Sequence, residues 1–128
     1  MAFSEFNEPN VEGFYRASFA GHVDFGEALL VLVDDLVAGA DSGGVSYDGF
    51  YRLGNGSIDL MLTLTVPQGT SLVQGVTARD RQLSFKVDMT VPLKEWASGV
   101  THRVETAYGP VNVIIKKLRN FPRRGAFQ

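Results

Sequence analysis

The chain has 128 residues, 45% of them hydrophobic and 20% charged, with a formal net charge of −2 and no cysteine. This length suits a single domain with one core, and the composition excludes an intrinsically disordered chain. Without cysteine there is neither a disulfide framework nor a zinc–thiolate site. The longest apolar run, from Ala28 to Val33, is too short to cross a bilayer, so we expect no membrane insertion.

The ends and halves of the chain differ in charge. The first nine residues hold two acids and no base, so we expect no secretory signal and a cytoplasmic protein. Residues 1–60 carry a formal charge of −8 and residues 61–128 carry +6, either as plain solvated surface or as complementary halves of a barrel or dimer. We predict one β domain over 1–128, with an N-terminal arm at 1–10 and a basic C-terminal tail at 119–128.

Taken in chain order, short segments rich in aliphatic, aromatic and threonine residues are separated by glycine-containing turns, which is typical of a small all-β domain. The pattern predicts strands at 13–20, 25–33, 36–40, 45–53, 57–66, 71–77, 82–91, 102–107 and 111–118. The clearest is 57–66, where every second residue from Ile58 to Val66 is aliphatic. Asn55-Gly56 before it and Asp34-Asp35 before 36–40 predict tight turns.

Three segments need a further interpretation. We predict that 71–77 forms an antiparallel hairpin with 82–91, which Pro92 ends. Segment 94–98 forms either a single helical turn or a loop that carries Trp96. Residues 28–33 are apolar on both faces, so this segment is either a short helix or a strand covered by a subunit, a helix or a terminal segment. A dimer interface there comprises Leu29, Leu30, Val31 and Leu32.

One pattern occurs twice, 36 residues apart: Glu12-Gly13-Phe14-Tyr15-Arg16 and Asp48-Gly49-Phe50-Tyr51-Arg52. The residues between them do not repeat, so the chain is not a solenoid. We expect both segments to be strands in which the glycine permits a bulge or a close approach, with aromatic side chains on the two faces.

Eight or nine short sequential strands predict a single antiparallel up-and-down barrel of about eight strands. The interior of such a barrel is either filled by side chains or holds one small ligand. An apolar cavity would be lined by the inward residues of the two clearest strands, namely Ile58, Leu60, Leu62, Leu64, Leu83, Phe85, Val87 and Met89.

The sequence offers no set of residues for catalysis, metal binding or phosphate binding. Neither His22 nor His102 accompanies a serine in a nucleophile elbow. The acidic, glycine-containing loop at 41–48 lacks the closing glutamate of a calcium loop, and its glycines lead into a strand rather than a helix. We therefore expect a protein that is not an enzyme and uses no metal or other cofactor.

The strongest local charge is the basic segment 116–124. It is a solvated or dimer-contacting tail, a site for an acidic protein partner, or a nucleic-acid contact, and the negative net charge argues against nucleic acid. Its candidate partner-binding residues are Lys116, Lys117, Arg119, Arg123 and Arg124.

A resemblance adds to this reading. Glu12-Gly13-Phe14-Tyr15, Gly26-Glu27-Ala28-Leu29-Leu30, Val37-Ala38-Gly39-Ala40-Asp41 and Ser46-Tyr47-Asp48-Gly49 follow one another in an order that resembles the GrlR-like family. These are small bacterial proteins whose founding member is a negative regulator of type III secretion genes. The resemblance covers residues 11–66, and its short glycine-based motifs describe backbone geometry more than activity.

The resemblance implies a lipocalin-like, or calycin-like, eight-stranded barrel that is usually dimeric and has an apolar cavity for a lipid-like ligand. It also implies a non-catalytic regulator that binds and inhibits a transcriptional activator. The acidic hairpin run associated with that contact corresponds to 53–59 here, where it is absent, so none of its residues is carried over. The alternative function is a carrier or sensor of a small apolar ligand.

Overall fold

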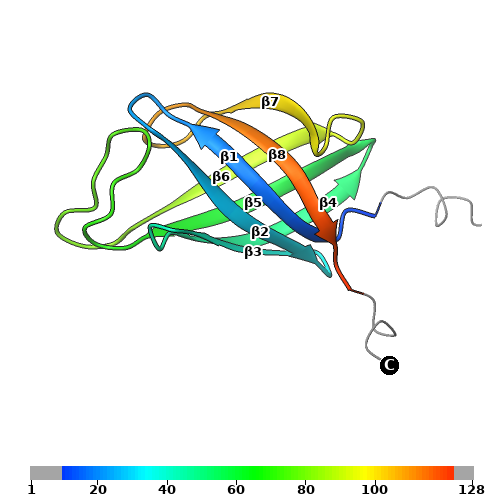
Figure 1. The fold of residues 1–128 in the computed structure, drawn as a ribbon, viewed down its shortest axis with the longest axis horizontal. Helices are drawn as coiled ribbons and strands as arrows, with labels where there is room; N and C mark the ends of the chain where they lie inside the picture. The colour runs from blue at the N-terminus through cyan, green and yellow to red at the C-terminus, as the bar shows by residue number, and fades with distance from the viewer. Residues whose placement is uncertain (1–9, 123–128) are drawn as a thin grey trace, which may run out of the picture.

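The computed structural model describes residues 10–122, which form eight antiparallel strands in a nearly closed barrel (Figure 1). The strands are β1 (Gly13–Ala20), β2 (Phe25–Val33), β3 (Leu36–Asp41), β4 (Ser46–Gly54), β5 (Ser57–Val66), β6 (Leu83–Pro92), β7 (Ser98–Val104) and β8 (Val111–Asn120). The predicted all-β, up-and-down architecture is confirmed, and it is consistent with a lipocalin-like barrel. No helix in this part of the chain is long and apolar enough to cross a membrane.

Each strand from β1 to β6 pairs with its successor in the chain, and β8 continues the sheet by pairing with β1. The remaining strand, β7, pairs only with β8. No backbone ladder joins β6 to β7 among the described residues, so the barrel keeps one seam between these two strands.

Three predicted strands match the structure in both bounds, because β1, β2 and β5 occupy 13–20, 25–33 and 57–66. The helical alternative for 28–33 is therefore wrong, because β2 runs through these residues. The two predicted tight turns are also confirmed, since Asp34 and Asp35 have φ values of 51° and 67°, and Asn55 and Gly56 have values of 54° and 74°.

The predicted strand 71–77 is wrong. This segment is a loop with one isolated bridge, between Ser71 and Thr77, and its predicted partner β6 pairs instead with β5 along its whole length. The cause is a local turn: Gly75 has a φ of 97°, and the backbone N–H of Leu72 donates to the carbonyl of Val76 at 2.7 Å. A chain turned back on itself cannot continue as a strand.

Smaller corrections concern the last strands. The strand predicted at 102–107 is observed at Ser98–Val104, because the Thr106 hydroxyl donates to the carbonyl of Gly109 (2.6 Å) and starts the turn. The tail predicted from residue 119 starts later, since β8 continues to Asn120. Most of the predicted N-terminal arm and the end of the tail lie outside the described residues. Segment 93–97 is a turn.

The repeated acid-glycine-aromatic pattern forms the same local structure at both places, with an inward tyrosine and a glycine that lies close to the neighbouring strand. Tyr15 and Tyr51 are buried inside the barrel, whereas Phe50 lies on its outer face. A Cβ at Gly49 would collide with the carbonyl oxygen of Met61 on β5, and one at Gly13 would collide with the carbonyl oxygen of Arg119 on β8. The β1–β8 register also shifts between Phe14 and Tyr15, as expected for a bulge.

One end of the barrel, which we call the closed end, carries the turns at 34–35, 55–56 and 93–97 and is packed with large side chains. The Tyr15 hydroxyl donates to the carbonyl of Val11 (2.6 Å) and accepts from Trp96 Nε1 (3.1 Å). The rings of Tyr15 and Trp96 lie 5.1 Å apart, and burial raises the pKa of Tyr15, which keeps its hydroxyl protonated. The packing is completed by Leu32, Ile58 and Val91, none of which is exposed.

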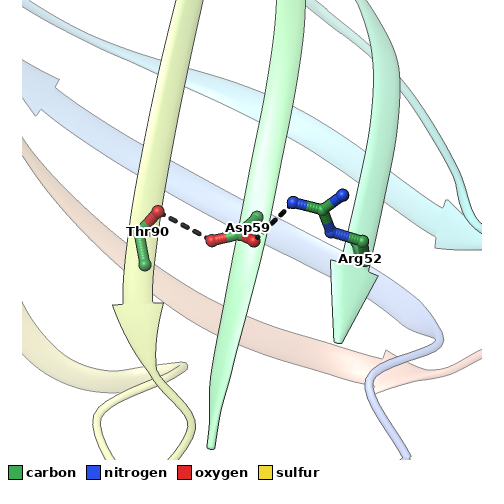
Figure 2. Close-up of polar contacts among 3 residues, drawn as sticks. All are labelled: Arg52, Asp59 and Thr90. Carbon is green, nitrogen blue, oxygen red and sulfur yellow. Dashed lines mark hydrogen bonds and ion pairs between the residues drawn. The ribbon is translucent and has the colours of Figure 1, made fainter. Parts of the chain in front are cut away.

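A polar network lies outside the closed end, on the solvent face of the sheet. Figure 2 shows Asp59 on β5 between Arg52 on β4 and Thr90 on β6, each directly opposite it in the ladders. Asp59 accepts from the Thr90 hydroxyl (2.7 Å) and forms an ion pair with Arg52 (3.3 Å). The hydrogen bond from Thr90, with help from Arg52, holds the pKa of Asp59 below its usual value.

Candidate functional site

The opposite end of the barrel, which we call the open end, contains a cavity of about 430 Å³. It lies among the turns at 21–24, 42–45 and 105–110 and the long loop 67–82. Its walls are the inward faces of the strands, where side chains alternate between the interior and the solvent. The largest part of its surface is aliphatic and aromatic, so the cavity suits an apolar molecule.

Six of the eight predicted cavity residues line this space, all on the neighbouring strands β5 and β6: Leu60, Leu62, Leu64, Phe85, Val87 and Met89. The prediction of Ile58 as a lining residue is wrong, because its side chain is fully buried in the closed end. Leu83 is not in the wall either, since it lies at the start of β6 and packs against the core.

The sequence reasoning missed the lining residues on the other strands. They include Ala17, Leu30, Tyr47, Val104, Val111 and Ile115. The signal was present for Ala17, Tyr47 and Val104, because polar residues flank each of them in the sequence. It was hidden for Leu30, because β2 is apolar on both faces.

Loop 67–82 covers part of the open end and is tied to three neighbouring turns. The carbonyl oxygen of Val73 accepts from the backbone N–H groups of Val23 (3.0 Å) and Asp24 (3.2 Å). Gln74 Nε2 donates to the Thr106 hydroxyl (3.1 Å). The Thr70 hydroxyl donates to the carbonyl of Gly43 at 3.1 Å. The segment predicted as a strand therefore serves as a cap.

The β2–β3 ladder ends beside the cavity, at the pair Ala28–Asp41. The preceding residues of β2, 25–27, have no partner on β3, and they line the cavity together with residues of the 42–43 turn and loop 67–82. Beside this end of the ladder, Val23 is 67% exposed and Phe25 is 79% exposed. Large apolar side chains with that exposure mark a surface that contacts apolar material.

Asp41 shapes the polar rim of the cavity. One carboxylate oxygen accepts from the backbone N–H groups of Gly43 (2.9 Å) and Val45 (3.1 Å), and the other accepts from the Tyr47 hydroxyl (2.9 Å). Burial, reinforced by the negative charge of Asp41, raises the pKa of Tyr47. The phenol therefore stays a hydrogen-bond donor to this carboxylate.

The four residues predicted for a dimer interface divide between the two faces of β2. Leu30 and Leu32 point into the barrel, with 4% and 0% exposure, and cannot contact a second subunit, so the prediction is wrong for them. Leu29 and Val31 lie on the outer face. Together with Leu36 on β3 and Phe50 on β4, they form a surface that we call the outer apolar patch, in which Leu29, Leu36 and Phe50 are 46%, 51% and 58% exposed.

The predicted basic residues do not form one surface. Lys116 is exposed on β8, whereas Lys117 donates to the backbone carbonyl of Asn10 (2.9 Å), and partial burial lowers the pKa of Lys117. Arg119 lies over the ring of Phe14, 5.8 Å from its centroid. Arg123 and Arg124 lie outside the described residues.

A search for metal ligands and the comparisons with known proteins complete the description of the site. Within residues 10–122, no group of three histidine, aspartate or glutamate side chains is placed to hold a metal ion. No protein-family model matches the chain, and no curated protein matches its sequence.

Proposed function

We propose that this protein is a non-catalytic binding protein that takes one small apolar ligand into the cavity at the open end of its barrel. The observation that carries this proposal is the cavity of about 430 Å³ with its largely apolar wall. Small-molecule sites in proteins have this size and this character, with a few polar groups at fixed positions.

The cost of the empty space supports the same proposal. Protein interiors are normally packed as densely as organic crystals, and the atoms around a void lose contacts that would stabilise the fold. The closed end is packed with fully buried side chains, whereas the open end contains the cavity. A bound ligand would restore the missing contacts, and the end of the β2–β3 ladder beside residues 25–27 offers it a route of entry.

The first test is native mass spectrometry of the purified protein, with organic extraction of any bound small molecule. It is followed by titration with Nile red, a neutral apolar dye. Leu62→Trp should abolish dye binding and leave the free energy of unfolding nearly unchanged, because the larger side chain occupies the cavity. The control is Met61→Trp, which places the same side chain on the outer face of β5 and should bind normally.

Two results would contradict the proposal. One is a Leu62→Trp variant that binds the dye as tightly as the unmodified protein. The other is a loss of about 1–3 kcal/mol in folding stability from Leu62→Trp, which is the cost expected when a residue is enlarged in a filled core.

A second candidate is a cytoplasmic regulator that works as a homodimer and binds a protein such as a transcriptional activator, in the manner of GrlR-type regulators of type III secretion. The observation that favours it is the outer apolar patch, which extends over three adjacent strands, with Leu36 directly opposite Phe50. Apolar surface of this kind marks contacts between proteins. The missing acidic run at 53–59 means that any such contact uses other residues.

Light scattering coupled to size-exclusion chromatography tests this candidate. We expect a dimer for the unmodified protein and a monomer for Phe50→Glu. The matched control is Leu118→Glu, because Leu118 is similarly exposed, at 53%, but lies on β8 and outside the patch. A monomeric unmodified protein, or a dimer in the Phe50→Glu variant, would remove this interface from consideration.

A further inference from the structure

The cavity is polarised along its length. Its deepest wall is formed by inward side chains from the middle of the strands, among them Ala17, Leu60 and Met89. Its polar side chains belong to the loops and strand ends of the rim, including Asp41, Thr70 and Gln74. A ligand that fills this space therefore buries an apolar body and leaves a polar head at the rim.

The charges at that rim have one sign. Among the described residues that line the cavity, Asp24 and Asp41 bring carboxylates to the rim, and there is no lysine, arginine or histidine. Glu27 also borders the space, but its side chain lies on the outer face of β2 with Leu29. Arg103 on the nearby end of β7 does not line the cavity and is already paired with Glu105 at 2.9 Å. A negative head group at this position would meet like charges across a medium less polar than water.

Three of the rim side chains direct a hydrogen-bond donor to a partner within the protein. The Tyr47 hydroxyl donates to Asp41, the Thr70 hydroxyl donates to the Gly43 carbonyl, and the Gln74 amide donates to the Thr106 hydroxyl. Carboxylate and phosphate groups are recognised by donors, mostly charged ones. In the described part of the chain, the rim offers no charged donor for such a group, whereas its carboxylates accept hydrogen bonds, so it suits a head group that donates.

We infer that the cavity selects amphiphiles with a neutral or cationic head group, such as a long-chain alcohol or amine, and discriminates against fatty acids and phosphate-bearing lipids. This inference rests on the proposed ligand-binding function and specifies its ligand class. The apolar wall supplies affinity through buried area, and the acidic, acceptor-rich rim supplies the selection.

The test uses three probes with the same chain: dodecylamine, dodecanol and dodecanoate, each displacing Nile red from the protein at neutral pH and below its micelle concentration. We expect the amine and the alcohol to displace the dye, and dodecanoate to bind about tenfold more weakly than dodecanol. Dodecanoate that binds as tightly as dodecanol would overturn the inference while the proposed function stands. Failure of all three probes and of the dye would remove the proposed function, and the inference with it.

A charge variant identifies the cause of the selection. Asp24→Asn should strengthen dodecanoate binding several-fold, weaken dodecylamine binding and leave dodecanol unchanged. The control is Asp48→Asn, an exposed position on the outer face of β4 that alters the net charge by the same amount. Equal effects of the two variants would overturn the inference, because the selection would then follow total charge and not the rim.

Discussion

The closed and open ends of this barrel are built from the same strands but are filled in different ways. At the closed end, Tyr15, Tyr51 and Trp96 bring three large aromatic side chains into a space that Leu32 and Ile58 complete. At the open end the inward residues are mostly aliphatic, and about 430 Å³ stays empty. In the proposed function, the packed end supplies stability and the cavity at the other end leaves room for a ligand.

The two ends also use their tyrosines differently. Inside the closed end, the hydroxyl of Tyr15 donates a hydrogen bond to a backbone carbonyl and accepts one from an indole N–H. The hydroxyl of Tyr47 donates a hydrogen bond to a carboxylate at the rim of the cavity. A buried polar group must find a partner in either place, but only the second partner carries a charge that a ligand would meet.

The largest expected effect comes from truncating the same residue type at the two ends. Leu32→Ala at the closed end should cost about 2–5 kcal/mol of folding stability, because it leaves a void in a packed region. Leu62→Ala in the cavity wall should cost about 1 kcal/mol, since its side chain already faces empty space. Urea unfolding followed by the fluorescence of Trp96, the only tryptophan, measures both. Equal losses would show that the open end is as well packed as the closed end.

A smaller effect is expected from removing the two hydroxyls. Tyr15→Phe should cost about 1–3 kcal/mol, because the Val11 carbonyl and the Trp96 N–H both lose a partner inside the protein. Tyr47→Phe should cost about 1 kcal/mol or less, since Asp41 keeps two backbone donors and borders solvent. Thermal unfolding of the two variants gives the order, and a larger loss for Tyr47→Phe would contradict the contrast between the ends.

The smallest effect concerns the outside of the closed end, where Asp59 lies between Arg52 and Thr90. The pKa of Asp59 is lowered in the folded protein, so its stabilising contribution is complete above the usual carboxyl pKa of about 4 and is lost as the pH falls through the lowered value. Asp59→Asn should therefore be slightly less stable than the unmodified protein at pH 7 and equal to it in acid. Unfolding curves at several pH values measure this difference. A difference that does not depend on pH would show that the carboxylate charge contributes nothing.

Much of the fold could be predicted from particular residues. The alternation from Ile58 to Val66 and the pairs Asp34-Asp35 and Asn55-Gly56 located strands and turns correctly, because period-two burial and left-handed turn positions are local properties. Segment 71–77 misled the prediction because Leu72, Val73 and Val76 favour strands, yet in the structure they belong to the cap that Gly75 allows to form.

The site could be predicted only in part. The inward stripe on β5 and β6 supplied six lining residues, but the sequence could not show where the stripe stops lining a cavity and starts filling a core. That boundary depends on Tyr15 and Trp96, residues far apart in the chain whose side chains meet at the closed end. Both faces of β2 are apolar, so the sequence could not show that Leu30 points into the barrel and Leu29 points outward. The register of β2 with β1 and β3 decides this.

The pairing of β1 with β8 has a consequence for the order in which the protein folds. Strands β1 to β6 form a series of neighbouring hairpins, each able to form soon after its residues are synthesised. The free edge of β1 must wait for the β7–β8 hairpin, since Gly13 pairs with Asn120 near the end of the chain. Closing so long a loop is entropically costly and slow. We expect barrel closure to limit the folding rate, and a six-stranded open sheet to be the intermediate that precedes it.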